Sequence, residues 1–167
     1  MKSDTLYIAY GSNLNFPQMA QRCPTAKVVG ASEIRGYELL FRGARNGAVA
    51  TVEPLRDSSV PVLLWNLKEC DHQALDRYEG YPHFYRKEIL PVELNGKSTS
   101  AMIYIMNDGH PLGAPSDYYL NTILDGYRTS GFDTDFLEQA VEKSIRLAQE
   151  QQEAEPEQGS LFGQKWW

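Results

Sequence analysis

The chain has 167 residues, of which 42% are hydrophobic and 23% are charged, so it is long enough for one domain with a substantial core. Its net charge of −6 argues against a nucleic acid or an anionic membrane as partner, because proteins that bind these usually present a basic face. No apolar run reaches the length of a membrane span, and the first residues, MKSDT, lack the apolar core of a signal peptide.

The first predicted element is a buried strand over Leu6 to Tyr10, which a loop with Gly11 and Asn13 follows. A helix then begins near Asn15, which can cap it, with Pro17 in the first turn. A strand, a tight loop and a helix start in this order aim backbone N–H groups at one point, which favours an anion or a developing oxyanion. An ordinary turn, in which Gly11 and Asn13 serve only the local backbone, fits the same residues.

The rest of the chain alternates strand and helix patterns. Strands are predicted over 27–34, 37–42, 48–52 and 60–67, with a polar turn at 55–59. Helical spacing over 68–78 ends at Gly80, and Asn95-Gly96 indicates a hairpin between strands at 84–94 and 99–106. Ser116 caps a helix that Gly131 ends, and a last helix follows. This order predicts an α+β fold with a mixed sheet or small β-barrel and a few helices outside it.

From residue 150 onward the helical pattern gives way to a polar, acidic segment that ends in Trp166 and Trp167. We therefore predict a domain over 1–149 and a flexible C-terminal tail over 150–167. Two interpretations of the tail stay open. In the first, the tail makes no contact with the rest of the protein. In the second, the two tryptophans dock on this chain or on a second copy, and docking on a second copy would give self-association.

Glu79 is the candidate acid–base residue. It is expected at the end of the helix over 68–78, where the helix dipole disfavours a carboxylate, and Tyr78, Tyr81 and Phe84 are close in sequence and able to exclude water. Both effects raise the pKa of a carboxyl group toward neutrality, as general acid–base catalysis requires. A solvated surface glutamate fits the same position.

The cysteines and histidines give no sign of a metal site. Cys23 and Cys70 are far apart and form no Cys-x-x-Cys pair, and the three histidines share no metal-ligand spacing with them. Free thiols are typical of a reducing compartment, so we expect a cytoplasmic protein without a metal or cofactor.

Several motifs, in one order, resemble the γ-glutamylcyclotransferase family. The two most specific are Tyr7 to Leu14, with the sequence YIAYGSNL, and Leu75 to Gly80, with the sequence LDRYEG. The other matching residues are Gly36-Tyr37, Leu40-Phe41, Ala50-Thr51-Val52, Tyr85 with the following Arg and Lys, Tyr119 and Gly126. The resemblance covers roughly Thr5 to Ala140, which is most of the chain.

The resemblance implies a small mixed β-barrel with helices packed outside. Members of this family cyclise the glutamyl part of a γ-glutamyl substrate to 5-oxoproline and release the linked amine. The catalytic glutamate corresponds to Glu79. The substrate-binding residues correspond to Tyr7, Ile8, Ala9, Tyr10, Gly11, Ser12 and Tyr119. The expected partner is a small γ-glutamyl compound, and the reaction requires no cofactor. A binding or interaction module without catalysis is the alternative function.

Overall fold

The computed structural model describes residues 4–164, and the side chains of residues 4–154. Its strands are β1 (Thr5–Ala9), β2 (Lys27–Arg42), β3 (Val49–Leu67), β4 (Tyr85–Leu94) and β5 (Lys97–Met106). Its helices are a short 3-10 turn η1 (Ser12–Leu14), α1 (Phe16–Arg22), α2 (Glu69–Glu79), α3 (Asp117–Ser130) and α4 (Thr134–Gln164). The predicted α+β class is confirmed.

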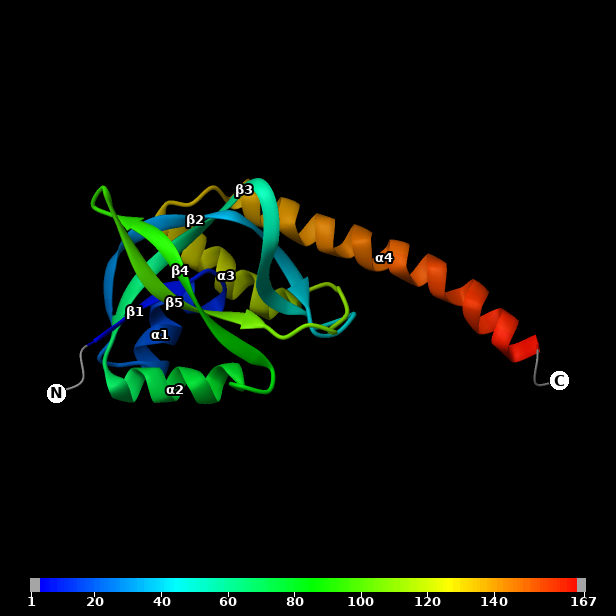
Figure 1. Ribbon diagram of the computed structural model, residues 1–167, viewed down its shortest axis with the longest axis horizontal. Coiled ribbons are helices and arrows are strands. Elements are labelled where there is room, and N and C mark those ends of the chain that lie inside the picture. The colour runs from blue at the N-terminus through cyan, green and yellow to red at the C-terminus, as the bar shows by residue number, and fades with distance from the viewer. Residues whose placement is uncertain (1–3, 165–167) are drawn as a thin grey trace.

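The five strands form one strongly curled sheet in the order β2-β3-β1-β5-β4 (Figure 1). β1 lies at its centre, antiparallel to β3 and parallel to β5. The edge strands β2 and β4 approach each other, and Ser32 Oγ donates a hydrogen bond of 2.7 Å to the Glu93 carbonyl oxygen. The sheet is not closed by a ladder between these edges, so it resembles a barrel without being a complete one.

The long antiparallel pair β2–β3 differs from the prediction. The predicted strands 27–34 and 37–42 are one strand, as are 48–52 and 60–67. The pairing changes from Tyr37↔Pro54 to Arg35↔Ser59, so residues 55–58 bulge out of the ladder instead of forming a turn between two strands. Gly36, with a φ of 80°, supplies the positive φ that this irregularity needs on β2.

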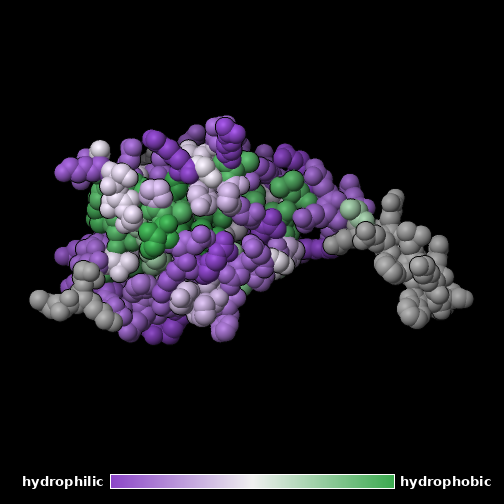
Figure 2. All heavy atoms as spheres, viewed as in Figure 1, coloured by the Kyte–Doolittle hydropathy of each residue, from purple (hydrophilic) through white to green (hydrophobic). Residues whose placement is uncertain are grey.

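The core fills the inside of the curled sheet and the layer between sheet and helices. Ile8, Phe41, Leu64 and Ile103 are fully buried there, and burying such a side chain is worth about 1.5–3 kcal/mol. The outer surface is mostly hydrophilic, although hydrophobic residues gather on the visible face over the sheet (Figure 2). Within the part of the chain that is described, no helix is long and apolar enough to cross a membrane.

The first half of α4 packs on β2. Leu137 is buried in the core, Ser144 Oγ accepts a hydrogen bond of 2.9 Å from the Phe41 N–H, and Lys143 pairs with Glu38 at 2.6 Å. The helix then projects from the body and continues to Gln164, well beyond the boundary at residue 149 that the sequence pattern predicts (Figure 1). Trp166 and Trp167 lie outside the described residues, so their docking stays a prediction.

Candidate active site

A cavity of about 140 Å³ opens where β1 ends, between the loop after it, the end of α2 and the start of α3. Glu79, the loop at Gly11 and Ser12, and Tyr119 all line this cavity, although they come from distant parts of the sequence. The complete lining is Tyr7, Tyr10, Gly11, Ser12, Asn13, Val49, Ala50, Tyr78, Glu79, Phe84, Tyr85, Tyr104 and Tyr119.

The predicted binding residues in β1 and directly after it form two groups, one that lines the cavity and one that lies in the core. Tyr7 and Tyr10 line the cavity. Ile8 and Ala9 have no exposed surface, and they pair with Leu64 and Leu63 of β3. These two residues therefore hold the strand that carries the site, while their own side chains belong to the core.

Gly11 allows the loop to lie close against its neighbours. Its φ is −125°, so it is not in the left-handed region. A Cβ atom at this position would lie 3.1 Å from Ala50 Cβ and 3.5 Å from the Tyr119 hydroxyl. The Gly11 and Ser12 carbonyls accept the bonds that form η1, at 3.0 and 3.1 Å, whereas the N–H groups at the start of such a turn have no partner within it.

Helix α3 supports the loop from behind. A Cβ atom on Gly126 would lie within 2.7 Å of the Leu14 carbonyl carbon and oxygen. Only a glycine at this position therefore allows α3 to approach η1 so closely. Ser116 caps the helix by accepting a hydrogen bond of 3.2 Å from the Tyr119 N–H. This cap and this close approach together place Tyr119 at the cavity, where its hydroxyl accepts a 3.0 Å bond from the Ala50 N–H.

Glu79 is the last residue of α2, and Gly80 ends the helix with a φ of 65°. The carboxyl group is half-buried and accepts a hydrogen bond of 3.2 Å from Asn13 Nδ2. Burial raises the pKa of Glu79 to about 7, and the nearby Arg22 charge and the Asn13 bond act in the opposite direction. Glu79 therefore has the pKa that proton transfer at neutral pH needs.

Asn13 is a cavity residue that the sequence did not single out. Arg22 Nη1 donates to Asn13 Oδ1 at 2.5 Å, which fixes the orientation of the amide. Asn13 Nδ2 then donates both to Glu79 and to the Tyr7 hydroxyl, the latter at 2.8 Å. In the sequence Asn13 looks like a turn residue, and nothing there indicates its contact with a glutamate 66 positions away.

Two of the cavity phenols, Tyr7 and Tyr119, can donate hydrogen bonds to a ligand. The hydroxyls of Tyr7 and Tyr119 accept bonds from the protein, so their own protons are left to donate into the cavity. Burial raises the pKa of both phenols, which keeps them protonated at neutral pH. Together with the loop amides, they make this side of the cavity suitable for an oxyanion or a carboxylate.

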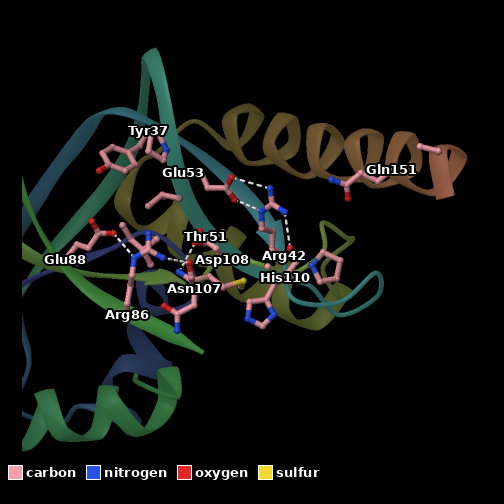
Figure 3. A pocket seen from close by; sticks show the side chains of 17 residues that line it. Tyr37, Arg42, Thr51, Glu53, Arg86, Glu88, Asn107, Asp108, His110 and Gln151 are labelled. Atoms are coloured by element: carbon pink, nitrogen blue, oxygen red, sulfur yellow. Dashed lines mark hydrogen bonds and ion pairs between the residues drawn. The ribbon is translucent and has the colours of Figure 1, made fainter. Parts of the chain in front are cut away.

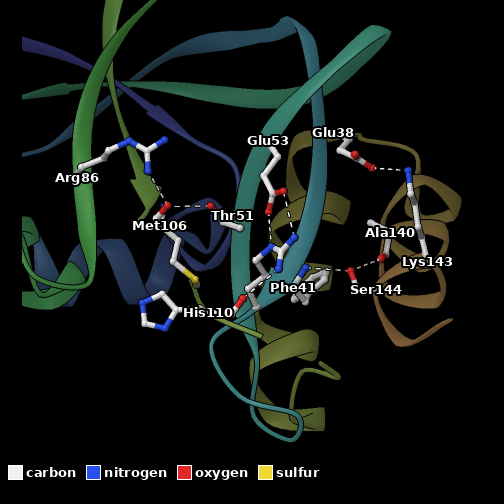
Figure 4. Close-up of polar contacts among 11 residues, drawn as sticks. Glu38, Phe41, Thr51, Glu53, Arg86, Met106, His110, Ala140, Lys143 and Ser144 are labelled. Atoms are coloured by element: carbon white, nitrogen blue, oxygen red, sulfur yellow. Dashed lines mark hydrogen bonds and ion pairs between the residues drawn. The ribbon is translucent and has the colours of Figure 1, made fainter. Parts of the chain in front are cut away.

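A larger groove of about 800 Å³ lies beyond β3, between the loop at 107–111 and α4 (Figure 3). Both of its arginines pair with glutamates. Arg42 contacts both carboxylate oxygens of Glu53 and donates to the His110 carbonyl at 3.0 Å (Figure 4). Arg86 binds Glu88 at 3.0 Å (Figure 3). Neither in this groove nor elsewhere in the described chain do three or more His, Cys, Asp or Glu side chains gather as metal ligands would.

Comparison with solved structures shows the class of fold. A protein described as gamma-glutamyl cyclotransferase superposes with a TM-score of 0.74 at 23% identity, over 82% of this chain and 86% of the other. A protein from Homo sapiens described as uncharacterized gives a TM-score of 0.74 at 24% identity, over 83% and 87% of the two chains. The curled sheet with its outer helices is therefore the fold of these proteins.

The family follows from the sequence comparison. A family model described as "Gamma-glutamyl cyclotransferase, AIG2-like" matches residues 7–121, which include all the predicted site residues. The chain belongs to this family. It is 24% identical over 142 residues to the gamma-glutamylcyclotransferase of Homo sapiens, covering 80% of this chain and 75% of that protein. The corresponding protein of Mus musculus is 25% identical over the same share of each chain.

Proposed function

We propose that this protein is a γ-glutamylcyclotransferase that converts a γ-glutamyl compound into 5-oxoproline and a free amine or amino acid. The observation that carries the proposal is Glu79. Its carboxyl group has a pKa raised to about 7, and the residue lines a small cavity together with Gly11, Ser12 and Tyr119. Family membership supports this type of reaction.

In the proposed mechanism Glu79 moves one proton. Its carboxylate takes a proton from the substrate's α-ammonium group, and the neutral amine attacks the γ-carbonyl carbon to close a five-membered ring. Glu79 then gives the proton to the leaving nitrogen as the old carbon–nitrogen bond breaks, and the ring nitrogen passes its second proton to the released amine, which leaves as an ammonium ion. The two proton transfers are sequential, so one carboxyl group serves both, and the reaction needs neither a metal nor a covalent enzyme intermediate.

The donor side of the cavity has the complementary task. The Gly11 and Ser12 amides and the Tyr119 hydroxyl would hold the substrate's α-carboxylate or the oxyanion that forms at the γ-carbon. Because the attack is intramolecular, folding the glutamyl chain into a near-attack shape supplies much of the rate. A tight cavity also excludes water, which would otherwise hydrolyse the substrate to glutamate.

We place the glutamyl part of the substrate in the small cavity. Its volume of about 140 Å³ is well below the 300–1,000 Å³ that is typical of sites for larger ligands. Tyr78 and Tyr119 also line a second, more open hollow of about 620 Å³ between α1 and α3. We place the leaving group in this outer hollow, where Arg22 supplies a positive charge and Gln18 and Gln21 supply amides.

The direct test is incubation with a panel of γ-glutamyl amino acids, γ-glutamylamines and glutathione, with 5-oxoproline detected by mass spectrometry. We expect time-dependent release of 5-oxoproline from at least one compound, slowed by about 10²–10⁴ in the Glu79→Gln variant. Binding without turnover for every compound would favour the alternative, a binding module. Burial of Glu79 argues against that alternative, since a carboxylate near the site weakens the binding of an anionic ligand.

A further inference from the structure

Tyr104 lines the cavity with Glu79, but it donates its hydroxyl proton away from any ligand. The O–H group donates to Asp76 Oδ1 at 2.5 Å. An ionised carboxylate accepts hydrogen bonds and donates none, so the phenol must be the donor. The remaining lone pairs of the Tyr104 oxygen can only accept.

Lys87 keeps Asp76 in this arrangement. Its ammonium group lies 2.9 Å from Asp76 Oδ1 and 3.0 Å from Oδ2, and it is also 4.0 Å from the centre of the Tyr81 ring. The ion pair holds the Asp76 carboxylate in place. Asp76 is therefore a fixed acceptor, and Tyr104 is held in one orientation.

Asp76 and Glu79 stand three positions apart on α2, so they lie on the same face of the helix. Tyr104 is bonded to the first and lines the cavity with the second. Tyr10 and Tyr85 also donate their protons, but to the backbone carbonyls of Tyr104 and Ala50, at 2.6 and 2.7 Å. Tyr104 is the cavity phenol whose proton goes to a carboxylate, which places a negative charge behind its oxygen.

The cavity thus has two unlike sides. Tyr7, Tyr119 and the loop amides offer protons, whereas Glu79 and Tyr104 offer lone pairs. A γ-glutamyl substrate has the matching polarity, with an ammonium group that donates and a carboxylate and carbonyl that accept.

We propose that the Tyr104 oxygen, together with Glu79, receives the α-ammonium group of the substrate, and that Asp76 and Lys87 are positioning residues that keep this oxygen an acceptor. The assignment rests on the proposed function and extends it. It makes the free α-amine a requirement of binding as well as of chemistry. Tyr104 holds the nitrogen in place while Glu79 removes its proton.

The experiment compares two ligands that differ only in the α-amine: L-γ-glutamyl-L-alanine and glutaryl-L-alanine, which lacks it. Both are titrated by calorimetry into the Glu79→Gln protein, in which turnover is blocked. A second substitution, Tyr104→Phe, should weaken the amine-bearing ligand by about tenfold or more, the usual effect of losing a hydrogen bond to a charged group. The ligand without the amine should change by less than about twofold.

Two further variants separate this role from a structural one. Asp76→Asn should act in the same direction as Tyr104→Phe but more weakly, again on the amine-bearing ligand alone. Tyr85→Phe is the matched control, because it removes a cavity hydroxyl that donates to a backbone carbonyl. It should leave the ratio of the two affinities unchanged.

Each outcome decides the assignment. A selective loss for the amine-bearing ligand in Tyr104→Phe supports it. Equal loss for both ligands, or a ratio that changes as much in Tyr85→Phe, overturns it while leaving the proposed function intact if the parent protein releases 5-oxoproline. Absence of binding for both ligands, together with no turnover by the unsubstituted protein, overturns both proposals.

Discussion

The small cavity and the larger groove are neighbours along β3, and they differ in how their charges are satisfied. Ala50 lines the cavity and Thr51 lines the groove, while Phe84 of the cavity stacks on His110 of the groove with ring centres 4.8 Å apart. In the groove each arginine has a glutamate partner (Figure 3). In the cavity the hydrogen-bond partner of Glu79 is the neutral amide of Asn13.

This difference in charge pairing says more about which region is the active site than the volumes of the two regions do. The groove is more than five times larger, at about 800 Å³ against about 140 Å³, but both of its arginines are already paired with glutamates. A half-buried carboxyl group held by a neutral amide keeps a raised pKa, and such groups are typical of sites that move protons. The predictions below set the two regions against each other.

Removing the carboxyl group of Glu79 should have the largest effect. Glu79→Gln should lower kcat by about 10²–10⁴, the usual contribution of a positioned acid–base group, because no other carboxyl group lines the cavity. Steady-state release of 5-oxoproline measures this. Glu53→Gln in the groove is the matched control, and it should keep kcat within about twofold. Equal activity of the two variants would show that Glu79 takes no part in the mechanism.

Filling the space at Gly11 should come next. Gly11→Ala places a Cβ atom 3.1 Å from Ala50 Cβ and 3.5 Å from the Tyr119 hydroxyl, so the loop must shift. Displacement of about 1 Å in a catalytic site can cost about 10²-fold, and we expect kcat/KM to fall by about 10- to 100-fold. Gly30→Ala is the control, since its Cβ would make an ordinary contact of 3.5 Å with Leu94. A normal kcat/KM in Gly11→Ala would show that the loop is an ordinary turn with no role in the site.

The raised pKa of Glu79 should appear in the pH dependence. Since the carboxylate acts first as a base, kcat/KM should rise with pH and level off above about 7. The Asn13 bond lowers this pKa, so Asn13→Ala should move the rise to higher pH. A pH profile of kcat/KM with the same inflection in both proteins would show that Asn13 does not tune Glu79.

The raised pKa of Glu79 should also affect the stability of the folded protein. This contribution should fall as pH rises, whereas kcat/KM should increase. The folded protein holds the Glu79 proton more tightly than the unfolded chain, so this contribution is complete below about 4.5 and is lost as pH rises through about 7. The melting temperature of the unsubstituted protein should therefore fall relative to Glu79→Gln between these values. Thermal unfolding followed at several pH values measures the difference, and parallel curves would contradict the raised pKa.

Breaking an ion pair of the groove should affect catalysis least. Arg42→Ala leaves Glu53 without its partner, and the pair is partly exposed, so we expect a loss of stability of about 1 kcal/mol or less. Activity should stay within about twofold of the unsubstituted protein. Denaturant unfolding and the 5-oxoproline assay measure the two effects. A large fall in kcat/KM with normal stability would show that the groove takes part in function.

Local features of the fold were predictable from sequence. Asn15 and Ser116 cap their helices through side-chain bonds of 3.0 and 3.2 Å, and Gly80 and Gly131 end theirs in the left-handed conformation. Asn95-Gly96 forms the hairpin turn between β4 and β5. Each of these depends on a few adjacent residues, so the sequence pattern carries the necessary information.

Features that depend on distant residues were not predictable. The prediction of a polar turn at 55–59 is wrong, because β3 runs through this segment as one strand, with residues 55–58 as a bulge between paired residues on either side. The bond from Asn13 to Glu79 and that from Tyr104 to Asp76 join residues 66 and 28 positions apart, and no local pattern indicates either. The family motifs indicated Glu79, the Gly11 loop and Tyr119, but only the fold brings them to one cavity.

The central place of β1 in the sheet has a consequence for dynamics. Its five residues are paired with β3, and it also pairs with β5, so neither side of the strand is a free edge. Its amide hydrogens should therefore exchange with solvent only when the whole domain opens, whereas those of projecting segments such as the end of α4 should exchange through local opening. The loop that carries Gly11 is thus attached to the slowest-exchanging part of the molecule, and its shape is set before any ligand arrives.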